Sequence, residues 1–151
     1  MLRNARVLVT GVTSPVARPV AVALARDNQV IGAARFRDET LRSSLAAEGV
    51  STARLDLVGG DLDDLPAEVD YVLHFAVVKS NKWSVDLDGN VGGLALLMER
   101  YQQARGFLHC STTAVYQPDG HRAFDEDAPS VTATAIISCR PTASPRSRRR
   151  P

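Results

Sequence analysis

One stretch near the start of the chain, residues 6–35, constrains the fold more than any other. It opens with the apolar run Val7 to Val9, which stops at Thr10-Gly11 and is typical of a strand buried on both faces. Apolar residues then recur at helical spacing from Val16 to Leu24, and a second apolar run starts at Val30. Strand, turn, helix and strand in this order predict a βαβ unit of the dinucleotide-binding kind.

The turn after the first strand has the features of an anion-binding site. Gly11 gives the backbone the freedom to turn sharply. Ser14 is expected to cap the helix, and Pro15 to occupy its first position, where the missing N–H costs nothing. The unpaired N–H groups and the dipole at such a helix start suit a pyrophosphate. The alternative for this stretch is a plain βαβ unit without a ligand.

The rest of the chain alternates strand and helix patterns, which predicts a parallel sheet with helices on both faces. Further helices are expected at 38–48 and 84–104, and further strands at 50–57, 69–78 and 107–110. In the longer helix Val91, Leu94, Leu97 and Met98 recur at helical spacing. The predicted fold is therefore a doubly wound α/β sheet of the Rossmann type with five strands.

Composition narrows the classes of function. A chain of 151 residues that is 44% hydrophobic and 23% charged is expected to form a soluble globular domain. No apolar run is long enough for a membrane span, so no membrane partner is expected. Cys110 and Cys139, the only cysteines, lack metal-ligand spacing, which predicts no metal site and a reducing, cytoplasmic location. Residues 140–151 hold five arginines and no acid, against 13 basic and 17 acidic residues in the body.

Several segments, taken in order, resemble the extended branch of the short-chain dehydrogenase/reductase superfamily, the NAD-dependent epimerases and dehydratases. That branch opens with Thr-Gly-x-x-Gly-x-x-Gly, and the matching residues here are Thr10 to Ala17, with Ser14 and Ala17 in place of the second and third glycines. The resemblance implies a cofactor pyrophosphate bound at the residues of this turn: Gly11, Thr13, Ser14, Pro15 and Val16. Ser14 adds a side chain where the backbone should approach phosphate.

The end of the second strand bears on which nicotinamide cofactor is bound. An NAD-binding unit usually carries an acid there for the ribose 2′-hydroxyl, whereas a nearby Arg accommodates the 2′-phosphate of NADP. Ala34 takes the place of that acid, Arg35 follows, and no carboxylate occurs before Asp38. This favours NADP over NAD as the NAD(P) cofactor. The alternative is that Arg35 and Arg37 are solvated surface charges.

Later segments extend the resemblance. Asp56-Leu57 matches the pair that the family places against the adenine, although an Asp at a strand end is more often a turn-former. The residues that match the family segment beside the cofactor are Phe75, Ala76, Val77 and Lys79. Asn90 matches a family Asn that supports the cofactor side of the site. His74, inside an apolar strand, is expected to be a satisfied core residue.

Only some of the family's catalytic residues have a match in this sequence. Residues 111–116 resemble the family segment Ser-Ser-x-x-Val-Tyr, which implies that Thr112 is the active-site hydroxyl that hydrogen-bonds the substrate oxygen. The alternative is an ordinary Thr-rich strand end. The family's catalytic Tyr-x-x-x-Lys is absent, because Phe75, Arg105 and Gly120 stand four residues after the three tyrosines and no lysine follows Lys82.

The resemblance covers roughly residues 5–130 and implies the cofactor half of an epimerase/dehydratase-type oxidoreductase. The predicted domains are 1–134, a partial NAD(P)-binding domain, and 135–151, a disordered Pro/Ser/Arg-rich tail. We expect a truncated or frameshifted product that lacks full catalysis, with a sugar nucleotide as the possible substrate of full-length relatives. The alternatives are a catalytically dead dinucleotide-binding remnant and a nucleic-acid or interaction module that uses the basic tail. The acidic body and the lack of aromatics between the arginines argue against nucleic acid.

Overall fold

A computed structural model describes residues 2–112, 115–117, 120 and 123–130. The chain divides into two compact units, Met1–Cys110 and Ser111–Pro151. The expected tail at 135–151, and with it the boundary at residue 134, lies outside the described residues. None of the described helices is long and apolar enough to cross a membrane.

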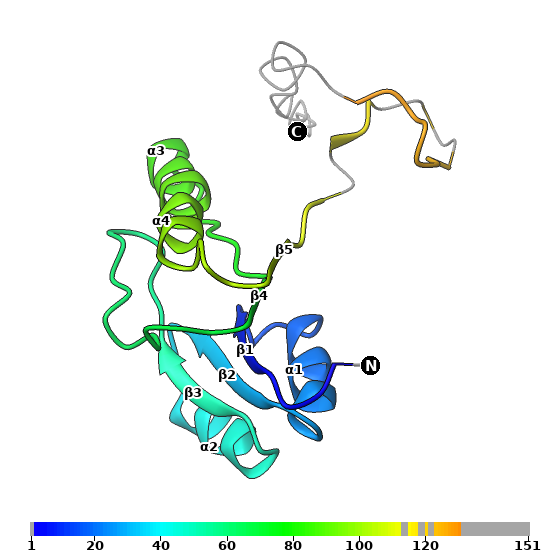
Figure 1. The fold of residues 1–151 in the computed structure, drawn as a ribbon. Coiled ribbons are helices and arrows are strands. Elements are labelled where there is room, and N and C mark those ends of the chain that lie inside the picture. The colour runs from blue at the N-terminus through cyan, green and yellow to red at the C-terminus, as the bar shows by residue number, and fades with distance from the viewer. Residues whose placement is uncertain (1, 113–114, 118–119, 121–122, 131–151) are drawn as a thin grey trace, which may run out of the picture. The chain divides into compact units, whose positions relative to one another are not determined.

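The first unit is built on a five-stranded sheet with the order β3-β2-β1-β4-β5 (Figure 1). The strands are β1 (Arg6–Thr10), β2 (Gln29–Ala34), β3 (Ser51–Arg54), β4 (Tyr71–His74) and β5 (Gly106–His109). All four neighbouring pairs are parallel. The chain order reverses between β1 and β4, and in open α/β sheets the crevice at such a switch point is where ligands bind. The α/β fold predicted from the sequence is confirmed.

The helices connect the parallel strands. They are α1 (Ala17–Ala25), α2 (Glu39–Ala47), α3 (Trp83–Leu87) and α4 (Gly93–Arg100), with the π-helical turn η1 (Asp88–Gly92) between α3 and α4. Asp38 caps α2 because its side chain accepts a hydrogen bond from the backbone N–H of Thr40 at 2.9 Å. Gly49 follows the same helix with φ +83°, as expected for a C-terminal glycine.

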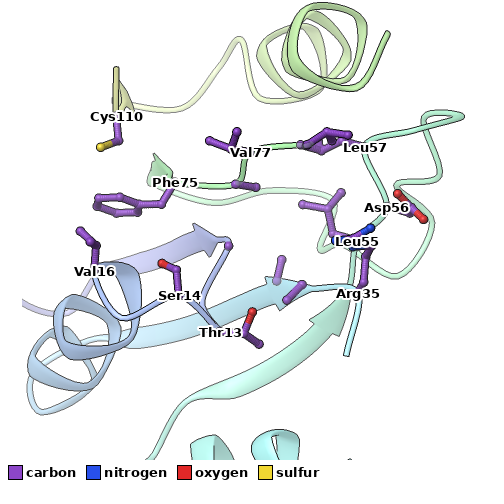
Figure 2. Close-up of a pocket in the computed structure, with 15 residues that line it drawn as sticks. Thr13, Ser14, Val16, Arg35, Leu55, Asp56, Leu57, Phe75, Val77 and Cys110 are labelled. Carbon is purple, nitrogen blue, oxygen red and sulfur yellow. The ribbon is translucent and has the colours of Figure 1, made fainter. Parts of the chain in front are cut away.

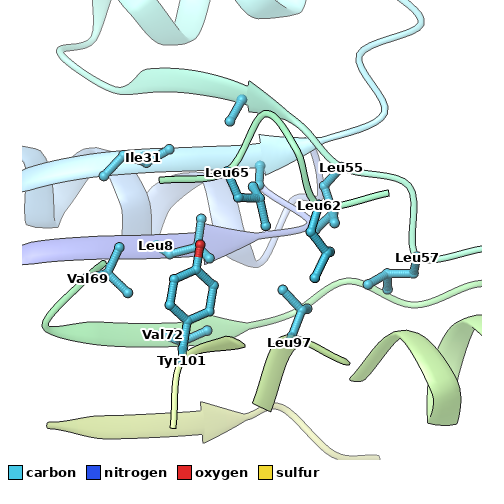
Figure 3. Packing of buried hydrophobic residues seen from close by; sticks show 12 residues of the cluster. Leu8, Ile31, Leu55, Leu57, Leu62, Leu65, Val69, Val72, Leu97 and Tyr101 are labelled. Carbon is cyan, nitrogen blue, oxygen red and sulfur yellow. The ribbon is translucent and has the colours of Figure 1, made fainter. Parts of the chain in front are cut away.

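Two apolar clusters cover the two faces of the sheet. Along β1, Val7 and Val9 belong to one cluster and Leu8 to the other, and all three are fully buried. The cluster around Val7 and Val9 is completed by α1 and α2 through Ala17, Ala21 and Leu45. The cluster around Leu8 is completed by Leu97 of α4 and by Tyr101 (Figure 3). Helices therefore pack on both faces, which is the doubly wound arrangement.

The predicted strands at 50–57 and 69–78 are longer than the observed ones. β3 ends at Arg54 because its neighbour β2 ends at Ala34. β4 ends at His74 because β1 stops opposite it at Thr10, and Gly11 then turns the chain away with φ +69°. Apolar runs continue beyond both strands, but their residues line a cavity instead of extending the sheet.

The helix predicted at 84–104 is also different in the structure. It ends at Arg100, and the turn η1 interrupts it. The extra residue of a π-helical turn shifts the face that the helix presents. Gly89, Gly93 and Leu97 are buried, whereas Val91 and Met98 are 59% and 52% exposed, so the apolar residues found at helical spacing do not share one buried face.

In the second unit the described residues form a small paired structure. Tyr116 makes an antiparallel bridge with Ser130, and the backbone N–H of Gln117 donates to the Pro129 carbonyl at 2.7 Å. The rings of Tyr116 and Phe124 stack with their centroids 5.5 Å apart. Thr112 lies in this unit, and its carbonyl accepts a hydrogen bond from the Val115 N–H at 3.3 Å.

Candidate functional site

A cavity of about 410 Å³ lies at the carboxyl end of the sheet, at the switch point between β1 and β4 (Figure 2). Its lining comes from the turn after β1, the ends of β2 and β3, the segment after β4 and the residue that follows β5. The lining residues are Gly11, Thr13, Ser14, Val16, Ala33, Ala34, Arg35, Leu55, Asp56, Leu57, Phe75, Ala76, Val77, Val78 and Cys110. The volume is within the range of about 300–1,000 Å³ common for small-molecule sites.

The turn after β1 approaches the segment after β4 very closely. A Cβ atom at Gly11 would lie 2.8 Å from the backbone N and Cα of Ala76, and the φ of +69° also requires glycine. The N–H of Gly11 donates to the Ala33 carbonyl at 2.8 Å, which ties the turn to β2 as well. Gly11 therefore allows the turn after β1 to pack directly against the segment after β4.

The start of α1 leaves hydrogen-bond donors free at the cavity wall. Ser14 caps the helix as predicted, with its Oγ accepting from the Ala17 N–H at 3.1 Å. The helix begins at Ala17 rather than at Pro15, because Pro15 and Val16 still belong to the turn. Within the described residues, the backbone N–H groups of Thr13 and Val16 make no hydrogen bond. Such N–H groups beside a helix N-terminus are suited to a phosphate oxygen.

A buried hydrogen-bond chain holds the segment after β4 in place. The Thr10 hydroxyl accepts from the Ala76 N–H at 3.2 Å and lies 2.8 Å from Nδ1 of His74. Because the one hydroxyl proton then points to Nδ1, we assign the His74 proton to Nε2. Burial, with a smaller effect of His109, lowers the pKa of His74 to about 4. His74 is thus a neutral, satisfied core residue, which confirms the prediction from the sequence.

The π-helical turn η1 and the first residue of α4 pack against two of the cavity-lining segments. The Asn90 side chain bonds the backbone of Val78 twice, accepting from its N–H and donating to its carbonyl, each at 2.8 Å. A Cβ at Gly89 would lie 2.5 Å from the Val78 side chain, and one at Gly93 would lie 2.7 Å from the Leu57 carbonyl. Asn90 does not line the cavity, but it fixes Val78, which does.

The ends of β2 and β3 supply the charged groups of the lining. Arg35 is exposed and follows the buried Ala34, so no carboxylate stands at the end of β2. Asp56 lines the cavity, and its Oδ1 accepts from the Val58 N–H at 3.2 Å. Asp56 is thus a turn-former and a cavity residue at once.

The structure brings most of the predicted site residues together. Those that line the cavity are Gly11, Thr13, Ser14, Val16, Arg35, Asp56, Leu57, Phe75, Ala76 and Val77. Pro15, Lys79 and Asn90 are outside the lining, and Thr112 belongs to the second unit. In the part of the chain that the structure describes, no group of three or more His, Cys, Asp or Glu could hold a metal ion.

Sequence reasoning missed several lining residues. They are Ala33, Ala34, Leu55, Val78 and Cys110. All except Val78 stand at or just after the carboxyl end of a strand, so a correct register between neighbouring strands would have indicated those four. Cys110, for example, follows β5, and its N–H donates to the carbonyl of His74 at the end of β4 at 2.9 Å.

The family model described as the NAD dependent epimerase/dehydratase family matches residues 7–135. The chain belongs to this family. The match contains every strand and helix of the first unit except the first residue of β1. No curated protein matches the sequence.

Three solved structures illustrate the similarity in fold. The UDP-N-acetylglucosamine 4-epimerase from Methanobrevibacter ruminantium M1, in complex with UDP-N-acetylmuramic acid, is 21% identical with a TM-score of 0.65, over 87% of this chain and 46% of that one. The Bordetella bronchiseptica enzyme WbmG, in complex with NAD and UDP, is 16% identical with a TM-score of 0.67, over 85% and 44%. A short chain dehydrogenase from Salmonella enterica serovar Typhi is 22% identical with a TM-score of 0.53, over 68% and 53%. The chain thus spans about half the length of these proteins.

Proposed function

We propose that this epimerase/dehydratase-family chain binds a nicotinamide dinucleotide in the cavity at the switch point. The observation that carries the proposal is the convergence there of the Gly11 turn, the end of β2 and the segment after β4. The turn fits a pyrophosphate because two N–H groups, of Thr13 and Val16, are unbonded within the described residues beside the start of α1. Gly11 keeps the turn free of a side chain that would collide with Ala76.

Residues of three segments would hold the cofactor. Thr13, Ser14 and Val16 would contact the pyrophosphate, with Pro15 fixing the backbone ahead of α1. Asp56 and Leu57 would bind the adenine, through the carboxylate and the apolar side chain respectively. The segment Phe75, Ala76 and Val77 would lie along the ribose and nicotinamide side, with Lys79 reaching toward a ribose or phosphate oxygen. When bound, the nicotinamide supplies a hydride donor or acceptor.

We propose NADP rather than NAD as the preferred cofactor. Arg35 lines the cavity at the end of β2, and Ala34 stands where an NAD-binding unit carries its acid. The end of β2 itself carries no carboxylate that would repel a 2′-phosphate, since the first acid after Arg35 in the sequence is Asp38. The exposed guanidinium of Arg35 is therefore available for a charge-assisted hydrogen bond to that phosphate.

We further propose that the chain binds cofactor without completing hydride transfer, as a domain of an oxidoreductase or as a catalytically inactive remnant of one. Thr112 would provide the hydroxyl that positions a substrate oxygen, but the general acid–base Tyr and its Lys are absent from the sequence. A sugar nucleotide is the proposed substrate class of the whole enzyme. Its support is that two enzymes of the same fold were solved with UDP-N-acetylmuramic acid and with UDP.

Titration with NADPH and NADH, followed by nicotinamide fluorescence and thermal melting, tests these proposals. We expect saturable binding that raises the melting temperature and is tighter for NADPH. Arg35→Glu should weaken NADPH binding about 10- to 100-fold, the equivalent of a lost charge-assisted hydrogen bond, and should leave NADH binding largely unchanged. Arg37→Glu is the matched control, because Arg37 is exposed nearby but does not line the cavity. A cooperatively melting protein that binds neither nucleotide would refute the proposed function.

A further inference from the structure

A second cavity, of about 520 Å³, lies at the amino ends of the strands, at the opposite edge of the sheet from the cavity at the switch point. It is bordered by the first residue of β1, by the residues just before β4 and β5, and by the end of α4. Figure 3 shows Val69, which lines this cavity, and Leu57, which lines the other, toward opposite ends of the strands. The two linings share no residue, so the cavities are separate.

Strand pairing brings two arginines and an acid to the same level of the sheet. The register of β4 with β1 and β5 places Arg6, Asp70 and Arg105 one residue before the first matched positions. The Asp70 N–H donates to the Arg6 carbonyl, and the Arg105 N–H donates to the Asp70 carbonyl, each at 2.8 Å. At a strand spacing of about 4.8 Å, the Cα atoms of Arg6 and Arg105 are roughly 10 Å apart. Their long side chains can therefore reach the same small ligand.

One wall of this cavity is held by Arg100 and Tyr101, at the end of α4. The Arg100 guanidinium donates to the Leu65 carbonyl at 2.9 Å and lies over the Tyr101 ring, 5.8 Å from its centroid. The Tyr101 hydroxyl donates to the Pro66 carbonyl at 2.7 Å. Burial raises the pKa of Tyr101, and the charges of Arg100 and Arg6 oppose that rise, so the charge of Arg6 acts on the same wall. The wall is thus fixed by its own hydrogen bonds and is positively charged.

The guanidinium groups of Arg6 and Arg105 are available to a ligand. That of Arg105 lies over the Tyr71 ring, 5.5 Å from its centroid. In the part of the chain that the structure describes, neither group makes a hydrogen bond or an ion pair. The Asp70 carboxylate between them accepts instead from the Arg6 backbone N–H, at 2.7 Å from its Oδ2. Two such groups beside a third, fixed guanidinium favour an anion with more than one negative charge.

We propose that this cavity binds the phosphate group of a small molecule between Arg6 and Arg105. A phosphate group carries a charge of about −1.5 to −2 at neutral pH and three acceptor oxygens, so it can pair with two guanidinium groups at once. A monocarboxylate carries a single charge and matches them less well. The planar guanidinium of arginine suits a phosphate because two parallel N–H groups can donate to it. The volume leaves room for an organic group beside the phosphate.

Titration of the full chain with inorganic phosphate, followed by amide NMR at constant ionic strength, locates the binding. We expect saturable shifts of the amide signals of Arg6, Asp70 and Arg105. Signals of residues 11–16 report separately on the turn at the switch point, so binding there is distinguished from binding at the amino ends of the strands. Acetate is the matched anion, and it should bind at least about tenfold more weakly because it carries one charge.

Arg6→Gln and Arg105→Gln should each weaken phosphate binding at least about tenfold, through the loss of a charge-assisted hydrogen bond. Arg26→Gln is the matched control, because Arg26 is exposed at the same edge and lines a neighbouring cavity but not this one. Glu68→Gln should tighten binding, since it removes a like charge from the lining. If Arg105→Gln, which loses the contact with Tyr71, fails to fold, Arg6→Gln and Glu68→Gln decide the test.

The proposal is overturned if phosphate gives no saturable shifts, or if the shifts are confined to residues 11–16. Phosphate binding that is no tighter than acetate binding would refute the match to two guanidinium groups. An equal loss of affinity in Arg26→Gln and Arg6→Gln would show a diffuse attraction to the positive edge instead of a site, and it would overturn the proposal as well.

Discussion

The stability of the fold should depend on pH through His74, one of the largest fully buried side chains. Its pKa is lowered from 6.5 to about 4, first by burial and second by His109. The unfolded chain therefore binds a proton at this residue between pH 6.5 and pH 4, and the folded chain does not. Stability contributed by the neutral ring is complete above pH 6.5 and is lost as the pH falls toward 4.

The size of the loss follows from the two pKa values. A difference of 6.5 to about 4 corresponds to about 3 kcal/mol of unfolding free energy at most, since each pKa unit is worth about 1.4 kcal/mol. About 1.4 kcal/mol should be lost by pH 5.5 and about 2.6 kcal/mol by pH 4.5. The structural cause is the burial of the ring, which disfavours its charged form.

Urea denaturation at pH 7.5, 6.5, 5.5 and 4.5 measures the effect. His74→Asn is the matched control, because an amide oxygen can replace Nδ1 as the acceptor for Thr10 but does not titrate. This variant should be less stable at pH 7.5 and should show a flatter pH dependence from 6.5 to 4.5. An equally steep decline in the variant would show that other groups cause the pH dependence, and a wild-type chain that gains stability on acidification would contradict the burial argument.

Three further sets of substitutions probe the cavity and the residues that support it. Thr10→Val should lower the free energy of unfolding, measured by urea denaturation, by about 2–4 kcal/mol, because His74 Nδ1 and the Ala76 N–H both lose their hydrogen-bond partner. Thr10→Ser keeps the hydroxyl and should lower it by less than half as much. Gly93→Ala should lower the free energy of unfolding by about 1–3 kcal/mol, because its Cβ would lie 2.7 Å from the Leu57 carbonyl. Gly92→Ala is the matched control: the nearest atom to its Cβ is 3.4 Å away, so this variant should be as stable as the wild type or more stable. Ser14→Gly should change stability by only a few tenths of a kcal/mol, as glycine is an acceptable cap, and should tighten nucleotide binding by fluorescence titration. Equal costs for the two alanine variants, or weaker binding by Ser14→Gly, would contradict these assignments.

The sequence predicted the fold where local pattern and burial agree. Val7 to Val9 are continuous and apolar, and β1 is buried on both faces as that pattern requires. The hydrogen bond predicted for Ser14 at the start of α1 was also correct, since it depends on a residue only three positions away. The helix predicted at 84–104 was wrong in its details because its register depends on distant contacts. No local signal reveals that Gly89 must fit against Val78.

The same dependence on distant contacts explains why the cavity-lining segment after β4 was predicted to be part of a strand. Apart from His74, the run from Val72 to Val78 is apolar, and nothing within it marks His74 as the last paired residue. The strand ends there because the neighbouring strand β1 ends at Thr10, whose side chain then bonds the backbone of Ala76 in place of a further strand residue. The apolar residues beyond the paired part of the strand line the cavity, and Val78 among them packs against η1. The same apolar pattern thus covers both the strand β4 and the cavity-lining segment that follows it. Only the length of β1 decides where the strand ends and the cavity lining begins.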